Sequence, residues 1–296
     1  MDHYSYSSLN EFREGCERKF LFQYEMLLQP LEDNEAPLVF GKAIHAACDT
    51  VWKGNSLEQA KEAFLAIMPT DMAGNRTVNV AMAMLDNYYA AWSPRFNDYE
   101  LLSCEKRLEM TLEGHKFVGV VDKLVWNRVT EALTVVDHKT TSSNLWSFRR
   151  HLPLSWQFTG YAALVNHCYS DGMTMGNIDV MVDILGVPKP PRRKNFDVST
   201  WVPGADELEQ GQEVFTKNFE QLQEWKQWAC STIDDIAKAE EKSQWRMCPS
   251  QCFAYNRECP FMSICEECPG NTSLVEVALK QHAKGLYKKV EPHGTE

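Results

Sequence analysis

Hydrophobic and β-branched residues are concentrated in two runs of the chain, near 117–126 and 133–140, which are separated by a short polar stretch. Both runs are rich in valine and other β-branched residues, which favour extended strands. The polar stretch at Asn127–Ala132 therefore predicts the turn of an antiparallel hairpin. A register that is symmetric about this turn places Asp122 directly opposite Asp137.

This register brings three charged side chains to one face of the hairpin. Directly opposed residues project from the same face with Cβ atoms about 4.5–5.5 Å apart, and Lys139 shares that face because side chains alternate along a strand. Two carboxylates at this distance repel each other unless a proton or a cation lies between them. A divalent ion with oxygen ligands, such as Mg²⁺, fits the arrangement. The alternative is a surface hairpin with one Asp–Lys pair and a second, solvated aspartate.

Helical periodicity and end signals predict helices in other segments. Ser8-x-x-Glu11 is a capping-box pattern, and the helix that it opens would carry Cys16 on its inward face. Further helices are expected at 39–52, from Ser56, at 77–92, from Pro153 and at 205–239. Further strands are expected at 100–111 and 178–187. Strands mixed with helices in this way are typical of an α/β protein.

Composition limits the classes of protein that need to be considered. The 296 residues, 44% hydrophobic and 24% charged, suit a globular chain of one large or two modest domains. The net charge of -11 argues against broad wrapping of a DNA duplex, which requires a basic surface, but it permits a narrow basic channel. No apolar run approaches the length of a membrane span, and the first residues lack the pattern of a secretory signal. We therefore expect a cytoplasmic protein without a membrane segment.

Basic residues that could line such a channel gather in two short segments. Phosphate contacts are expected from Arg149, Arg150, Lys189, Arg192, Arg193 and Lys194. For any one of them, a solvated loop position is the alternative.

The ten cysteines indicate a bound metal, because disulfides are rare in cytoplasmic proteins. Cys248-x3-Cys252 and Cys265-x2-Cys268 have the pair spacings of a tetrahedral zinc site. The other cysteines outside the C-terminal segment lack such spacings, and most are expected to be packed thiols.

Five motifs in a fixed order resemble those of a known family. They are Gly41-x-x-x-His45, Gly119-x-x-Asp122, Asp137-x-Lys139, Gln157-x-x-x-Tyr161, and Cys16 with Cys252-x6-Cys259-x5-Cys265. Together they resemble the PD-(D/E)XK nuclease superfamily, specifically its RecB-like and AddB-like iron–sulfur exonuclease branch, which includes CRISPR-associated RecB-like exonucleases. The resemblance spans roughly Ser5 to Cys265. Many members have two residues between the first two cysteines of the triad, so the gap of six is a departure.

The resemblance implies a restriction-endonuclease-like α/β core, in which helices flank a central mixed sheet, and an iron–sulfur subdomain that joins the two terminal regions. The expected parts are an N-terminal helix at 1–30, a nuclease core at 31–245, a cysteine segment at 246–269 and a partly disordered tail at 270–296.

The resemblance also assigns roles. His45, Asp122, Asp137 and the backbone carbonyl of His138 would hold Mg²⁺ or Mn²⁺, and Lys139 would orient the attacking water. Gln157 and Tyr161 would position the DNA strand. The family often has a glutamate at the position of Glu105, but a charged edge position explains that residue equally well.

The cysteines Cys16, Cys252, Cys259 and Cys265 would bind a 4Fe–4S cluster, which needs four thiolates. The zinc alternative uses two of these cysteines and leaves Cys16 and Cys259 without a role. Which of Cys248 and Cys268 could replace a proposed ligand stays open.

The expected function is hydrolysis of DNA phosphodiester bonds, mainly by exonuclease action on single-stranded or frayed ends, in recombination, repair or CRISPR adaptation. The chain has no phosphate-binding G-x-x-x-x-G-K-[ST] loop, so a helicase would be a separate protein, with a recombinase or a CRISPR integrase as further expected partners. The alternative is a non-catalytic DNA-binding or scaffold subunit that an iron–sulfur cluster or zinc stabilises.

Overall fold

The computed structural model describes most of the chain. The described residues are 3–31, 36–71, 74–170, 177–194, 196–254, 257–267, 274, 275, 277, 279 and 286–290. Most of the expected tail at 270–296, and Cys268, lie outside them.

The chain forms two compact units. One comprises Asn34–Leu108 and Val120–Leu222, and we call it the sheet unit. The other comprises Met1–Asp33, Glu109–Gly119 and Gln223–Glu296, and we call it the terminal unit because it contains both ends of the chain. Two strands and one long helix, β2 (Tyr99–Leu112), β3 (His115–Asn127) and α8 (Phe219–Glu241), contribute residues to both units.

A mixed five-stranded sheet has the order β2-β3-β4-β5-β6. The remaining strands are β4 (Ala132–Thr141), β5 (Asn177–Gly186) and β6 (Gln210–Asn218). β4 runs antiparallel to β3 and parallel to β5, and β6 is antiparallel to β5. β4 and β5 are buried along most of their length because helices cover both faces of the central strands.

The predicted hairpin register is confirmed. Asn127 pairs with Ala132 next to the turn, and the ladder continues in step to Lys123 opposite Val136. Continuing it by one residue would align Asp122 with Asp137. The position of the polar turn was therefore sufficient to predict which residues of the hairpin face each other.

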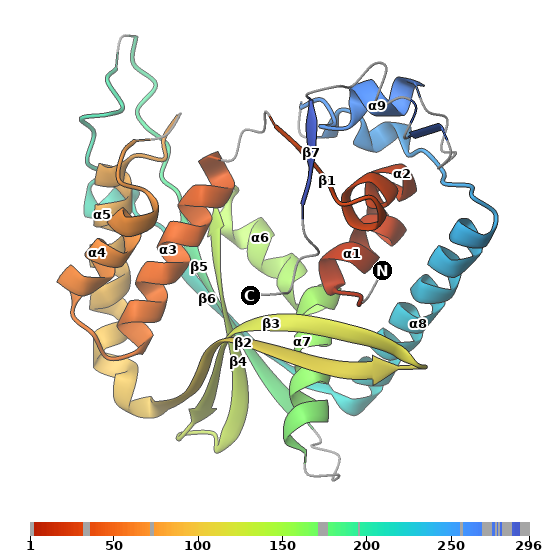
Figure 1. Ribbon diagram of the computed structural model, residues 1–296. Coiled ribbons are helices and arrows are strands. Elements are labelled where there is room, and N and C mark those ends of the chain that lie inside the picture. The colour runs from red at the N-terminus through yellow and green to blue at the C-terminus, as the bar shows by residue number, and fades with distance from the viewer. Residues whose placement is uncertain are drawn as a thin grey trace. The chain divides into compact units, whose positions relative to one another are not determined.

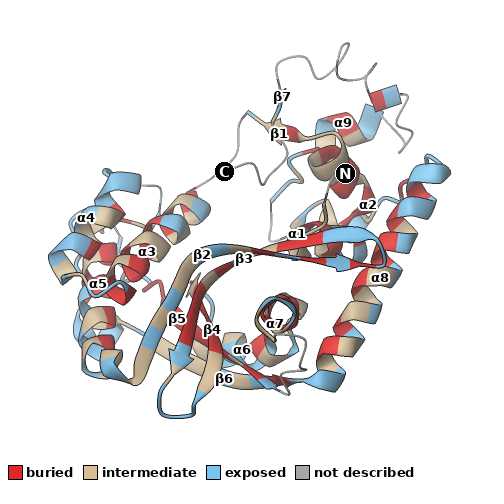
Figure 2. Ribbon diagram, turned by 60° about the horizontal axis from the view of Figure 1, so that its bottom comes forward, coloured by how far each residue is buried: buried red, intermediate tan, exposed pale blue. Residues whose placement is uncertain are grey.

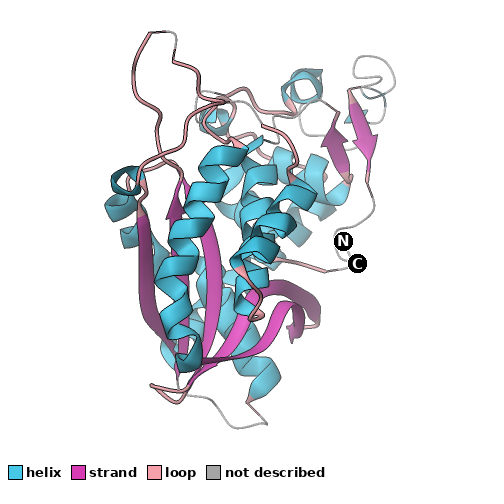
Figure 3. Ribbon diagram, turned by 90° about the vertical axis from the view of Figure 1, so that its left-hand side faces the viewer, coloured by secondary structure: helices cyan, strands magenta, loops and turns pink. Residues whose placement is uncertain are grey.

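One face of the sheet packs against α3 (Ala36–Trp52), α4 (Leu57–Ile67) and α5 (Val78–Trp92), which Figures 1 and 3 show as one layer of helices beside the strands. These helices bury residues such as Phe40, Phe64 and Tyr88 against Val136 of the sheet in one hydrophobic core. α4 begins with the expected capping box, in which Ser56 and Gln59 cap each other. Thr77 caps α5 through its side chain.

The other face carries α6 (Leu145–His151) and α7 (Trp156–Tyr169), which form the connection between the parallel strands β4 and β5. In Figure 2 the sheet lies between α7 on one side and α3–α5 on the other. α7 follows the 3₁₀ turn Leu152–Leu154, and Ser155 caps its first turn. A parallel pair needs such a crossover, and here it contains the predicted helix that follows Pro153.

The helix expected at 205–239 was wrong in part. This segment divides into the 3₁₀ turn Ala205–Glu207, strand β6 and helix α8. β6 pairs with the otherwise open edge of β5 from Leu185 opposite Gln210 to Asn177 opposite Asn218. This pairing partner is far away in sequence, and its hydrogen bonds outweigh the local helical periodicity around Phe215.

The N-terminal helix begins earlier than expected and is interrupted. The capping box is formed by Ser5 and Ser8, and α1 spans Tyr6–Asn10. A π-helical turn (Glu11–Gly15) follows, and Cys16 is extended before α2 (Glu17–Phe20) begins. Gly15 disfavours a continuous helix at this point.

The terminal unit brings the first and last segments of the chain together. The short strand β1 (Leu28–Pro30) pairs with β7 (Tyr287–Lys289), and Phe12 and Phe20 pack against Trp245. This unit also contains the second π-helical turn (Leu21–Glu25), the 3₁₀ turn Pro249–Gln251 and α9 (Met262–Glu267). Within the described part of the chain, no helix combines the length and apolar character that crossing a membrane requires.

Candidate active site

Three side chains from three different elements form a compact acidic group in the sheet unit. His45 on α3, Glu105 on β2 and Asp122 on β3 each present a ligand atom, and these atoms lie within 4.8 Å of one another. The Nδ1 atom of His45 lies 3.2 Å from Oδ2 of Asp122. One imidazole with two carboxylates is a donor set that suits Mn²⁺ or Mg²⁺.

Glu105 is the member of this group whose role the sequence left open. Its φ of 48° lies in the left-handed region, which is rare for a glutamate within a strand. Partial burial, followed by the negative charges of Asp122 and Asp49, raises the pKa of Glu105 to about 7. A carboxyl group held next to other carboxylates in this way is suited to binding a cation, because the cation removes the repulsion.

Asp137 and Lys139 form an ion pair on β4. Lys139 Nζ donates to Oδ1 of Asp137 at 2.9 Å and lies 2.7 Å from Oδ2. Asp137 is 1% exposed, and its Oδ2 atom accepts no hydrogen bond. Burial raises the pKa of Asp137, while Lys139 lowers it and Asp122 raises it further. This buried carboxylate oxygen suits a cation, but it already lies 2.7 Å from the Lys139 ammonium, and Asp137 is not within the 4.8 Å group of His45, Glu105 and Asp122.

The side chain of His138 projects from the opposite face of β4 to Asp137 and Lys139, and its ring centroid lies 5.9 Å from that of His45. Its ring is fully buried, with Nδ1 3.0 Å from Lys123 Nζ and Nε2 2.8 Å from the hydroxyl of Tyr88. The backbone N–H of His138 donates to Oδ2 of Asp122 at 3.1 Å and so fixes that carboxylate. The role of the His138 carbonyl as a metal ligand stays a prediction.

Gln157 and Tyr161 are one helical turn apart on α7, and they are joined by a hydrogen bond from Gln157 Nε2 to the Tyr161 hydroxyl of 3.0 Å. Burial raises the pKa of Tyr161, and the charge of Asp137 raises it further. The ring of Phe158 on the same helix lies 5.6 Å from Lys139 Nζ. α7 therefore lies close to the Asp137–Lys139 pair, as its position after the motif suggested.

The expected basic residues are exposed and lie in two segments of the sheet unit. Arg149 forms an ion pair with Glu213 at 2.8 Å, while Arg150 stacks on the ring of Trp146 at 4.8 Å. Trp146 itself is 67% exposed, which is unusual for a tryptophan.

Lys189 lines a polar cavity of about 220 Å³ at the carboxyl ends of β4 and β5. Thr141, Ser142, Ser143 and Asn144 also line it. Arg192, Arg193 and Lys194 follow in an exposed loop.

Five of the cysteines line one pocket in the terminal unit. The pocket is lined by Cys16, Cys252, Cys259 and Cys265, together with Cys248 and the basic residues Arg18 and Lys19. Arg18 donates to the sulfur of Cys265 at 3.5 Å, and the backbone N–H of Cys248 donates to the sulfur of Cys16 at 3.4 Å. Burial raises the pKa of both Cys252 and Cys259, and neighbouring cysteines raise it further.

No three cysteines among the described residues bring their sulfur atoms within 4.8 Å of one another. Cys268, the fourth ligand of the zinc alternative, lies outside the described residues.

Comparison with known proteins defines the class of protein. The family model of the PD-(D/E)XK nuclease superfamily matches residues 3–266. The chain belongs to the PD-(D/E)XK nuclease superfamily.

A solved structure has the same fold. A candidate exonuclease from Eubacterium rectale superposes with a TM-score of 0.50 over 87% of this chain and 89% of its own, at 16% sequence identity. No curated protein matches the chain. The superfamily implies a nuclease with DNA as its substrate, and its members usually use divalent metals.

Proposed function

We propose that this chain is a Mg²⁺- or Mn²⁺-dependent deoxyribonuclease of the RecB-like branch, which degrades single-stranded or frayed DNA ends mainly as an exonuclease. The observation that carries the proposal is the convergence of His45, Glu105 and Asp122 in one group. The Asp137–Lys139 pair on the adjoining strand complements this group. The presence of all these groups argues against a non-catalytic DNA-binding or scaffold subunit.

The proposed roles follow from the chemistry of each group. His45, Glu105, Asp122 and Asp137 are the side chains that would hold the divalent ion, with the carbonyl of His138 as a further ligand. When bound there, the ion polarises the scissile phosphate and lowers the pKa of a bound water. Lys139 would then leave part of its contact with Asp137 to orient that water and to offset charge that develops at phosphorus.

The substrate strand would approach along the surface next to α6 and α7. Trp146 offers an exposed ring on which a base can stack, and Arg150 and Lys189 would supply positive charge to the backbone. Gln157 and Tyr161 would position the phosphate next to Asp137. The roles that this activity would serve are recombination, repair or CRISPR adaptation, with a helicase, a recombinase or a CRISPR integrase as the partner.

The four cysteines Cys16, Cys252, Cys259 and Cys265 would hold a 4Fe–4S cluster in the terminal unit. The observation that supports this proposal is that these four cysteines, together with Cys248, line one pocket. Arg18 and Lys19 next to the pocket would partly offset the negative charge of the thiolates.

The proposed activity is tested by degradation of end-labelled single-stranded DNA with Mn²⁺ or Mg²⁺. Asp137→Ala and Lys139→Ala are expected to abolish the activity of the wild type. Lys61→Ala is the matched control, because Lys61 is as exposed as Lys139 and also pairs with an aspartate of the sheet unit, Asp86. Equal activity of all variants would assign any degradation to a contaminant or to another site.

A further inference from the structure

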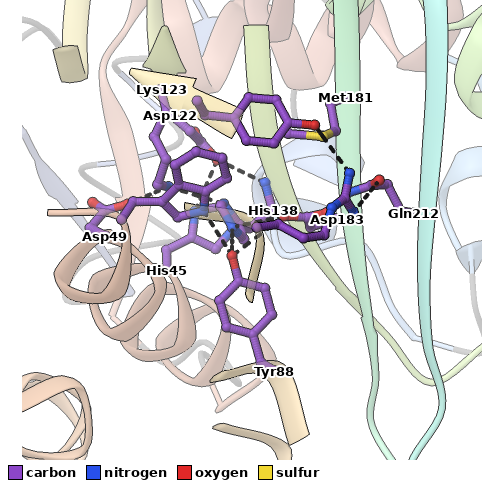
Figure 4. A network of polar contacts seen from close by, with 12 residues as sticks. His45, Asp49, Tyr88, Asp122, Lys123, His138, Met181, Asp183 and Gln212 are labelled. Atoms are coloured by element: carbon purple, nitrogen blue, oxygen red, sulfur yellow. Dashed lines mark hydrogen bonds and ion pairs between the residues drawn. The ribbon is translucent and has the colours of Figure 1, made fainter. Parts of the chain in front are cut away.

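A chain of polar contacts runs through the interior of the sheet unit behind the candidate metal centre (Figure 4). Lys123 is fully buried and forms an ion pair with Asp49 on α3. It also contacts His138 Nδ1 at 3.0 Å. This network of contacts continues from His138 Nε2 to the hydroxyl of Tyr88 at 2.8 Å, and from there to Asp183 at 3.4 Å.

The donor and the acceptor of each hydrogen bond in this network can be assigned. The Nζ atom of Lys123 forms an ion pair with the carboxylate of Asp49, so Lys123 is an ammonium ion in this network. An ammonium has no lone pair and can only donate, so Nδ1 of His138 accepts from Lys123. Nε2 of the ring then carries the proton and donates to the hydroxyl of Tyr88.

Hydrogen bonds also hold the end of this network at Tyr88 and Asp183 in place. The Tyr88 hydroxyl also accepts from Trp52 Nε1 at 2.8 Å, and Gln212 donates to Asp183 Oδ1 at 2.8 Å. A buried network whose donors and acceptors are matched in this way has one arrangement of low energy, and it resists displacement of any of its members.

Three residues of this network, Asp49, Lys123 and His138, each lie on the same helix or strand as a proposed metal ligand. On α3, Asp49 lies one turn after His45. On β3, Lys123 directly follows Asp122, and on β4, His138 directly follows Asp137. Three of the four proposed ligands, His45, Asp122 and Asp137, thus lie on the three elements that Lys123 connects. Figure 4 shows His45 and Asp122 beside Asp49, Lys123 and His138.

We propose that Asp49, Lys123 and His138 are positioning residues, which set the distances between His45, Asp122 and Asp137 and so determine metal affinity. The buried ammonium connects α3 to β3 through Asp49, and β3 to β4 through His138. This inference rests on the proposed function, because it assumes that those three side chains bind a divalent ion. Residues that orient ligands in this way change metal affinity by about 10–100-fold when they are lost.

The test compares Mn²⁺ binding, measured by electron paramagnetic resonance, with thermal stability. The main variant is the double substitution Asp49→Asn with Lys123→Met, which removes both charges and leaves no single buried charge behind. The matched control is Lys217→Met, because Lys217 is also a buried lysine of the sheet unit, at 2% exposure. Its Nζ atom donates to the carbonyl of Pro153 and not to the elements of the metal centre.

The double variant is expected to bind Mn²⁺ about 10–100-fold more weakly, while Lys217→Met binds it within twofold of the wild type. In nuclease assays, the double variant should need more Mn²⁺ for half-maximal rate, with an unchanged KM for DNA and a kcat that recovers at high Mn²⁺ concentration. A merely structural role would affect the two lysine variants alike.

A second variant covers the case in which the double variant does not fold. Tyr88→Phe keeps the ring on α5 and removes only the hydroxyl that holds His138, and it is expected to weaken Mn²⁺ binding several-fold. The positioning role is overturned if a folded double variant, or Tyr88→Phe, binds Mn²⁺ as tightly as the wild type does. Failure of the wild type itself to bind Mn²⁺ would instead overturn the proposed function.

Discussion

Lys139 Nζ lies 2.9 Å from one carboxylate oxygen of Asp137 and 2.7 Å from the other, yet only the first accepts its hydrogen bond. The second oxygen is buried and is paired with the Lys139 ammonium by charge. If the proposed divalent ion binds Asp137, it would compete with Lys139 for this oxygen.

Metal affinity should depend on pH through Glu105. Its pKa is raised to about 7 by burial and by the charges of Asp122 and Asp49, so below pH 7 a proton competes with the metal ion. Affinity for Mn²⁺ is therefore expected to rise between pH 6 and pH 8. Glu105→Gln should lower the affinity at pH 8 and make the rise shallower. Isothermal titration calorimetry at three pH values measures both effects, and an unchanged profile in the variant would exclude Glu105 as a ligand.

Trp146 should contribute to binding of single-stranded DNA. Its ring is 67% exposed and already stacks with Arg150 at 4.8 Å, and stacking of a base on an aromatic side chain contributes about 1–3 kcal/mol. Trp146→Ala is expected to weaken binding of a fluorescent oligonucleotide by that amount.

The matched control for this prediction is Trp126→Ala, because Trp126 is a second exposed tryptophan of the sheet unit, on β3 beside the hairpin turn. Its loss should leave binding unchanged. Equal losses in the two variants would show that Trp146 is not a specific stacking platform.

A cluster in the cysteine pocket should give the protein visible absorption and should raise its melting temperature. Removing one of four thiolates prevents complete coordination of a 4Fe–4S cluster, so Cys16→Ser is expected to lose most of the iron, the sulfide and the visible absorption. Its melting temperature should also fall, because a shared cluster would no longer link Cys16 to the C-terminal cysteines.

Cys168→Ser is the control for this experiment, since Cys168 is exposed and lies in the other unit. This variant should keep its iron, its sulfide and its visible absorption. A colourless wild type that contains one equivalent of zinc would favour the zinc alternative and rule out the cluster.

Asp183 should make the fold less stable as the pH rises. Burial raises its pKa to about 7 in the folded chain, against about 3.9 in an unfolded chain. Between these values the folded state binds the additional proton, so the free energy of unfolding decreases as pH increases from 4 to 7, by about 1.4 kcal/mol per pH unit for this group. Above pH 7 the contribution no longer changes.

Asp183→Asn removes this ionisation and should flatten that part of the stability profile. Urea unfolding at pH 5 and pH 8 measures the effect: relative to the wild type, the variant should be more stable at pH 8 than at pH 5. A parallel pH dependence in both proteins would show that Asp183 has an ordinary pKa.

Local patterns in the sequence determined a large part of this molecule. Two β-branched segments on either side of a short polar turn predicted the register of β3 and β4, because the position and length of the turn determine which residues pair. Ser56 and Thr77 marked helix starts, because a cap depends on neighbours within one turn. The order of the motifs was enough to indicate the nuclease superfamily.

Only the tertiary structure decided the rest. β6 is a strand because it pairs with β5, and Glu105 joins His45 and Asp122 because three separate elements meet there. The sequence could not show that the His138 ring belongs to the interior, where it contacts Lys123 and Tyr88. Helix caps and hairpin registers depend on interactions within a few residues, whereas these features depend on contacts between segments that are far apart in the chain.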